Sequence, residues 1–269
     1  MSWINARRRR PAAGYAALLL GLVVVALVYG SLTSKSGGMV ASAATGAQQD
    51  IAAGKALFQA SCSSCHGLEA QGTSQAPSLI GAGAAAVDIW KSTGRMPAKE
   101  VGAENERKPV TFTPRQIHDI AGYVASLGGG PPIPTAAQVS AAGADMALGQ
   151  ELFTANCAQC HNFVGAGGAL TYGKYAPALT ASTPTQIYTA MLTGPEAMPV
   201  FNDTTVTPQE KRDIIAYITA TRSEGNPGGF SLGRVGPVTE GLVAFLGLLF
   251  FMVLTAMWIT AKHRKSPNE

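Results

Sequence analysis

The stretch that decides the fold is GKALFQASCSSCH, residues 54–66, which recurs as GQELFTANCAQCH at residues 149–161. Both stretches hold a glycine, a phenylalanine four positions later, and a Cys-x-x-Cys-His motif in the same register. Self-similarity of this kind is typical of a chain that contains two copies of one structural unit. The sequence therefore predicts two tandem domains.

Three later landmarks repeat in the same order, although the spacing between them drifts. They are Ala76–Leu79 with Ala176–Leu179, Thr93–Pro97 with Thr193–Pro199, and Thr113–Tyr123 with Thr207–Tyr217. Between the two copies lies GGGPPIP, residues 128–134, and consecutive glycines and prolines cannot propagate a helix. We therefore place the first domain at 48–128, a linker at 129–144 and the second domain at 145–222.

Short helices are expected within each copy. The first helix should span roughly residues 50–61 and 145–156, ending at the cysteine motif. A threonine before a proline at the first helical position opens the last helix, at Thr113-Pro114 and at Thr207-Pro208. These helices should run to about Leu127 and Thr221. Because no alternating strand pattern stands out, the predicted fold class is all-α.

All four cysteines lie in the two Cys-x-x-Cys-His motifs. Two thiols at this spacing can both add to the vinyl groups of a haem, and the adjacent histidine then faces the iron. A redox dithiol or half of a zinc site would have to explain a histidine directly after each second cysteine. The sequence predicts two covalently bound haem c groups, held by Cys62, Cys65 and His66, and by Cys157, Cys160 and His161.

Each haem iron needs a sixth ligand or an open position, and Met96 and Met198 are the candidates. Each follows its own haem motif in a Thr-Gly…Met-Pro context that repeats. A thioether opposite histidine raises the reduction potential and suits electron transfer. Met191, on an apolar helix before the second loop, is expected to be ordinary core filler.

Charge is sparse and unevenly placed. Charged residues make up 13% of the chain and the formal net charge is +4, yet residues 31–238 hold 13 basic and 14 acidic residues. The basic excess lies at the two ends, in Arg7–Arg10 and after residue 261. A nucleic-acid-binding protein would carry it across a folded face, so we exclude that class.

Both basic ends flank apolar segments. Residues 242–261 contain no charge and are long enough to cross a bilayer, and basic residues that follow a membrane helix stay cytoplasmic. Residues 11–34 are also uncharged. We favour a retained anchor there over a cleaved leader, since Ala41-Ser42-Ala43 lies too far beyond the apolar run for the usual cleavage site. Both termini would then be cytoplasmic and both domains extracytoplasmic. The expected segments outside the two domains are the Arg cluster and anchor at 1–34, a Gly/Pro linker at 223–240, a transmembrane helix at 241–261 and a tail at 262–269.

Each copy resembles a class I cytochrome c domain. The resemblance rests on the motifs above and on four positions in each copy: Gly54, Phe58, Ile120 and Tyr123, with Gly149, Phe153, Ile214 and Tyr217. In that family, these positions form the crossing of the first and last helices. The resemblance also implies that the carbonyls of Pro77 and Pro177 accept from the histidine rings, and that Leu79 and Leu179 pack on the haems.

The whole chain resembles the di-haem cytochrome c subunit of actinobacterial cytochrome bcc complexes, the menaquinol:cytochrome c reductases. Arg95–Pro97, Lys108–Phe112 and Asn226–Gly229 look like segments of that subunit. This resemblance implies a cytochrome b subunit, a Rieske iron–sulfur subunit and the copper-centre subunit of a haem-copper oxidase as partners. The chain would relay single electrons as part of a quinol–cytochrome c reductase (a translocase), with no catalytic residue of its own.

Two alternatives remain open. One is a di-haem carrier subunit of another oxidase or of a periplasmic dehydrogenase. The other is a di-haem peroxidase, which would need an exchangeable site on one iron, and Met96 and Met198 argue against that.

Overall fold

The structure is a computed structural model that describes residues 19–21, 23–24, 49–100, 102, 104–223, 232 and 237–263. Contacts divide the chain into one unit of residues 1–47 and another of residues 48–269. In the first unit, residues 19–21 and 23–24 are helical. The rest of the expected N-terminal membrane helix lies outside the described residues.

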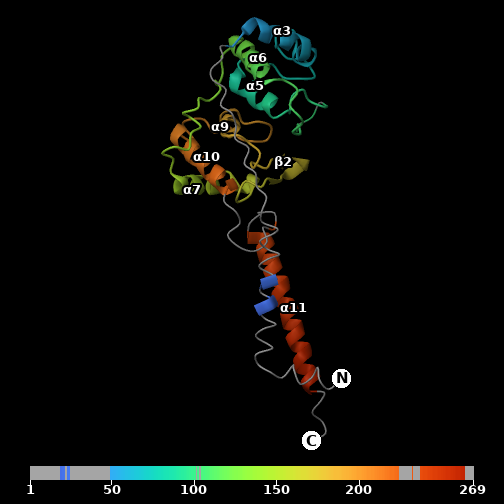
Figure 1. Ribbon diagram of the computed structural model, residues 1–269. Coiled ribbons are helices and arrows are strands. Elements are labelled where there is room, and N and C mark those ends of the chain that lie inside the picture. Colours follow the sequence, from blue (N-terminus) through green and yellow to red (C-terminus); the bar gives the residue numbers. More distant parts are fainter. Residues whose placement is uncertain are drawn as a thin grey trace. The chain divides into compact units, whose positions relative to one another are not determined.

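The first domain holds four helices, of which Figure 1 labels α3, α5 and α6. They are α3 (Ile51–Ser61), α4 (Ser63–His66), α5 (Gly83–Ser92) and α6 (Pro114–Ser126). Asp50 caps α3, because its carboxylate accepts from the N–H groups of Ala52 and Ala53. Thr113 and Gln116 form a capping box that opens α6. The helices expected at 50–61 and from Pro114 to about Leu127 are therefore confirmed.

The second domain repeats this arrangement. Its helices are α7 (Met146–Asn156), α8 (Ala158–His161), α9 (Pro184–Thr193) and α10 (Pro208–Ser223). Asp145 caps α7 in the same way that Asp50 caps α3. The helix expected at 145–156 is confirmed, and the last helix ends at Ser223, two residues beyond the expected Thr221.

The first and last helices of each domain cross at a glycine. A Cβ at Gly54 would lie 2.0 Å from the carbonyl oxygen of Asp119, and a Cβ at Gly149 would lie 2.0 Å from that of Asp213. Only a residue without a side chain allows backbones to approach this closely. Beside each crossing two aromatic rings pack at centroid distances of 5.3 and 5.4 Å, Phe58 on Tyr123 and Phe153 on Tyr217. The crossing implied by the family resemblance is confirmed.

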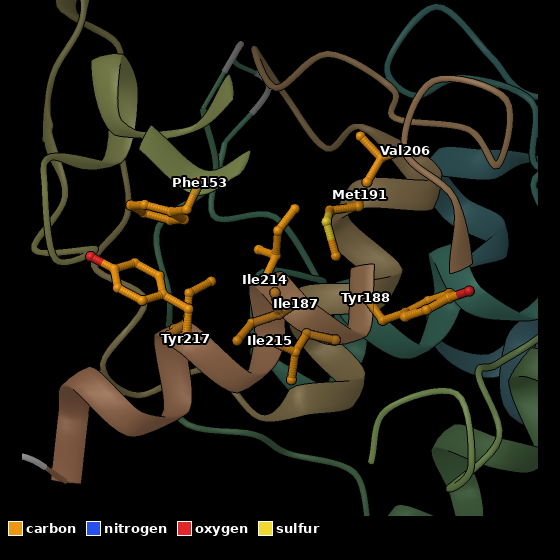
Figure 2. Close-up of a cluster of buried hydrophobic side chains, with 9 residues drawn as sticks. Phe153, Ile187, Tyr188, Met191, Val206, Ile214, Ile215 and Tyr217 are labelled. Atoms are coloured by element: carbon orange, nitrogen blue, oxygen red, sulfur yellow. The ribbon is translucent and has the colours of Figure 1, made fainter. Parts of the chain in front are cut away.

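Each domain has its own apolar core. In the second domain, shown in Figure 2, nine buried side chains form one cluster, eight from α7, α9 and α10 and one, Val206, from the loop before α10. Met191 lies within this cluster and is 3% exposed, as expected for core filler. The core of the first domain is built from smaller residues, with Phe58, Ile120 and Tyr123 as its large members.

One feature departs from the all-α expectation. A two-stranded antiparallel hairpin joins β1 (Gly168–Ala169) to β2 (Tyr175–Ala176), with the 3-10 turn η1 (Thr171–Gly173) between them. The hairpin lies where the second copy has five more residues between its histidine and its proline than the first copy has. Two-residue strands carry no alternating pattern that a sequence could display. The protein is otherwise helical where it is described.

The C-terminal helix α11 (Pro237–His263) is the one long apolar helix among the described residues, and it is drawn in red in Figure 1. Its segment Val238–Ala261 has a mean hydropathy of 2.5, is long enough to cross a membrane, and is not buried by the rest of the protein. Leu and Phe side chains are exposed along it. A helix that is apolar all round belongs inside protein or lipid, so α11 suits a membrane anchor.

Candidate haem sites

Each Cys-x-x-Cys-His motif forms one tight turn at the end of the first helix. The N–H of Cys62 donates to the Phe58 carbonyl at 2.7 Å, and the N–H of His66 donates to the Cys62 carbonyl at 3.0 Å. In the second domain Cys157, Phe153 and His161 make the same two bonds at 2.8 and 2.9 Å. The turn therefore holds two thiols and one imidazole at fixed places on the same piece of backbone.

The four thiols are unpaired and lie at the edge of the protein. Cys65 and Cys160 are exposed, whereas Cys62 and Cys157 are half-buried. Burial, with the neighbouring Cys160, raises the pKa of Cys157 to about 11. Burial also raises the pKa of Cys62, although Lys91 acts in the opposite direction. Among the described residues, no three His, Cys, Asp or Glu side chains converge as they would in a zinc site.

Both histidine rings are buried and oriented by a proline carbonyl. Nδ1 of His66 lies 2.8 Å from the Pro77 oxygen, and Nδ1 of His161 lies 3.0 Å from the Pro177 oxygen. Because a carbonyl only accepts, Nδ1 must be the donor, and Nε2 keeps a lone pair for a metal. Burial lowers the pKa of His161, outweighing the bond to Pro177 that raises it. The contact implied by the family resemblance is confirmed, and the ring is set up as a neutral ligand.

A mostly apolar cavity of about 290 Å³ lies against the second domain. Its wall contains all four predicted site residues of that domain: Cys157, Cys160, His161 and Met198. Leu179 also lines it, as the resemblance implied, and so does the buried Met191. The residues that carry two thiols, an imidazole and a thioether therefore line one apolar space, and these are the donors that a covalently attached haem needs.

In the first domain, the motif and the methionine come from different elements. Cys62, Cys65 and His66 lie at α4, and Cys62 and Leu79 pack against the apolar core. Met96 lies in the loop after α5, where its N–H donates to the Trp90 carbonyl at 3.1 Å. Met96 is half-buried.

Lys108 is a residue that the sequence reasoning missed. Its ammonium donates to the carbonyls of Arg95 at 2.9 Å and Pro97 at 2.7 Å, on the two sides of Met96. In the sequence, Lys108 stood out only as the first residue of the family-like segment Lys108–Phe112. Its distance from Met96 along the chain gave no sign of a contact with the Met96 loop. Lys108 fixes the backbone that presents the thioether.

Comparison with known proteins places the two domains in cytochrome families. Residues 51–128 match the family model for cytochrome c, and residues 144–218 match that for cytochrome c oxidase, cbb3-type, subunit III. A cytochrome bc1 complex cytochrome c subunit from Corynebacterium diphtheriae is 41% identical over 276 residues, covering 96% of this chain and 98% of that protein. This chain belongs to that family of cytochrome c subunits.

Two mycobacterial members carry the same name. The Mycobacterium tuberculosis protein is 42% identical over 262 residues, covering 95% of this chain and 93% of that protein. The Mycobacterium leprae protein is 46% identical over 215 residues, covering 78% of this chain and 74% of that protein. The predicted family and an electron-transfer role are confirmed. Two cytochrome c domains imply covalently bound haem c, and the cavity of the second domain fits it.

Proposed function

We propose that this chain is the membrane-anchored electron carrier of a quinol-oxidising cytochrome bc complex, with two haem c groups. One would be held by Cys62, Cys65, His66 and Met96, and the other by Cys157, Cys160, His161 and Met198. The observation that carries the proposal is the apolar cavity whose wall holds the second of these sets complete. Bound haem c supplies a one-electron redox centre.

The chain's own residues hold and insulate that centre. The cysteine thiols would hold the haem, while the Pro77 and Pro177 carbonyls fix the orientation of each imidazole. Apolar side chains such as Leu179, Ile187 and Phe201 line the second cavity. If His161 and Met198 both bound the iron, no open position would remain, which would favour electron transfer over chemistry at the iron.

The partners follow from family membership. The relatives are named as subunits of a cytochrome bc1 complex, so we propose that this chain lies beside a cytochrome b subunit and a Rieske subunit. It would pass electrons to the copper-centre subunit of a haem-copper oxidase. The haem domains would face the extracytoplasmic side, with both termini in the cytoplasm. The match of residues 144–218 to an oxidase subunit family favours one alternative, a carrier that belongs to the oxidase itself.

Haem attachment is tested by counting haems per chain in the purified protein with a pyridine haemochrome assay. The wild-type chain should give two, and replacing Cys62 and Cys65 by alanine should remove one. Replacing Cys157 and Cys160 should remove the other, because a thioether needs the sulfur. Ser63→Ala with Ser64→Ala changes the two intervening positions of the same motif, one half-buried and one exposed, and should leave the count at two. Fewer than two in the wild type would contradict the proposal.

The partner assignment is tested by mild-detergent purification. Cytochrome b and Rieske subunits should co-purify with the tagged chain. Recovery of oxidase subunits without these two would favour the oxidase-carrier alternative.

A further inference from the structure

The cavity of the second domain is not closed by the second domain alone. Five residues of the first domain line it: Ile89, Trp90, Thr93, Arg95 and Arg107. The first three lie on α5 or at its end, and α5 packs against α9. A haem in the second domain would therefore touch side chains of the first.

Polar contacts hold this junction together. Arg107 donates from Nη2 to Ser182 Oγ at 3.1 Å and to Gln186 Oε1 at 3.2 Å, at the start of α9. Gln186 in turn donates from Nε2 to Ser92 Oγ at 3.0 Å. Each bond joins a residue of the first domain to one of the second. The first domain's share of the cavity wall is therefore fixed in place.

Arg95 is a buried cation with little to bind among the described residues. It is 7% exposed and lines the cavity. Its guanidinium makes one ion contact, from Nε to Glu196 Oε1 at 3.9 Å, and that oxygen already accepts the Asn105 N–H at 2.7 Å. A separation of 3.9 Å is too long for a hydrogen bond. Among the described residues, no hydrogen bond from the Arg95 guanidinium is found, so its donors are available to a bound group.

Arg107 adds a second positive charge at the same end. Its three acceptors, the Ala181 carbonyl, Ser182 and Gln186, are all neutral. Burial lowers the pKa of Arg107, and the charge of Arg95 lowers it further. Glu196 is the one carboxylate within ion-pair distance of Arg95 among the described residues, and burial, together with the neighbouring Glu104, raises its pKa. This end of the cavity suits an incoming anion.

Haem carries two carboxylates on one edge, while the rest of the molecule is mostly apolar. Resting on the two-haem function proposed above, we propose that Arg95 of the first domain binds a carboxylate of the haem in the second domain, with Arg107 supporting it from the rim. Arg–carboxylate pairing is strong in such sites, because the planar guanidinium can offer two parallel donors.

This assignment links the two haems through one short segment. Arg95 precedes Met96, the proposed ligand of haem 1 in the first domain, while its side chain reaches haem 2 in the second. Trp90 lines the haem 2 cavity, and its carbonyl accepts the Met96 N–H. The reduction potential of haem 2 therefore depends on residues of the first domain.

The test is redox titration of the full-length purified protein, with haem 1 identified as the centre that moves in Met96→His. Arg95→Gln should lower the potential of haem 2, because a lost cation leaves the reduced haem less stabilised and the carboxylate unpaired. Arg95→Lys keeps the charge and should restore much of the shift. Arg107→Gln should lower the same potential by less. Lys55→Gln removes an exposed charge from α3 and should move neither potential.

A haem count precedes each titration and separates this inference from the proposed function. Fewer than two haems in the wild type contradicts the function itself. Two haems with haem 2 unmoved in Arg95→Gln, or a shift confined to haem 1, overturns only the role of Arg95. If the Arg95→Gln protein does not accumulate with both haems, redox titration of Arg107→Gln becomes the test of the inference. An unmoved haem 2 there also overturns the inference.

Discussion

His66 and His161 each follow their second cysteine directly, so the motif alone predicts them as ligands, whereas a carbonyl 11 or 16 residues away orients each ring. The same contrast holds for the methionines of the second domain. Met191 and Met198 both line the cavity, yet Met191 is buried in the apolar core and Met198 is half-buried in a loop. A loop position leaves the sulfur freer to approach a bound group.

Met96→His and Met198→His should each keep the haem but lower the potential of that one haem, since imidazole stabilises ferric iron more than a thioether does. We expect a fall larger than about 59 mV, which is a tenfold change in a one-electron equilibrium. Redox titration measures both centres at once. Met191→Leu is the control and should leave both potentials nearly unchanged, because a buried Met tolerates a swap of similar volume. A large shift from Met191→Leu with none from Met198→His would move the ligand assignment to Met191.

In each domain, the crossing of the first and last helices sets the geometry of the site. α3 and α7 end at the cysteine turns, and their crossings with α6 and α10 fix where those turns lie. The crossing glycines were recognised in the sequence through their family positions. The contact that requires them, a carbonyl oxygen 2.0 Å from the missing Cβ, becomes visible only when both helices are placed.

Gly149→Ala should force α7 away from α10 and destabilise the second domain by about 1–3 kcal/mol, the usual cost of overpacking. Thermal or denaturant unfolding of the haem-loaded protein would measure the loss. Gly102→Ala is a suitable control, because its nearest neighbour to an added Cβ is 3.9 Å away and its φ is not positive. An unchanged unfolding midpoint in Gly149→Ala would show that the helices can separate freely.

Two features concern the molecule as a whole: the apolar surface of α11 and the junction between the two domains. α11 exposes apolar side chains along its length, which water would not favour. The junction joins the methionine loop of the first domain to the cavity of the second. The first domain therefore contributes directly to the wall of the second domain's cavity.

The topology is tested with a reporter that is active only after export. A fusion after Lys265 should be silent, because basic residues beyond a membrane helix stay inside, and a fusion after Gly130, between the domains, should be active. Strong activity after Lys265 would contradict the C-terminal crossing. N-terminal sequencing that begins near Ala44 would show that the first segment is a cleaved leader.

The sequence by itself determined the repeat, the two cysteine motifs, the ends of the first helices, the starts of the last helices and the apolar C-terminal helix. Each of these depends on residues near one another in the chain, where spacing, caps and composition act locally. Only the tertiary structure decided that Lys108 hydrogen-bonds the backbone beside Met96 and that Gln186 binds Ser92. It also decided that Arg95 lines the second cavity. Such contacts join elements distant in sequence, and they depend on how two packed domains fit together, which no local pattern encodes.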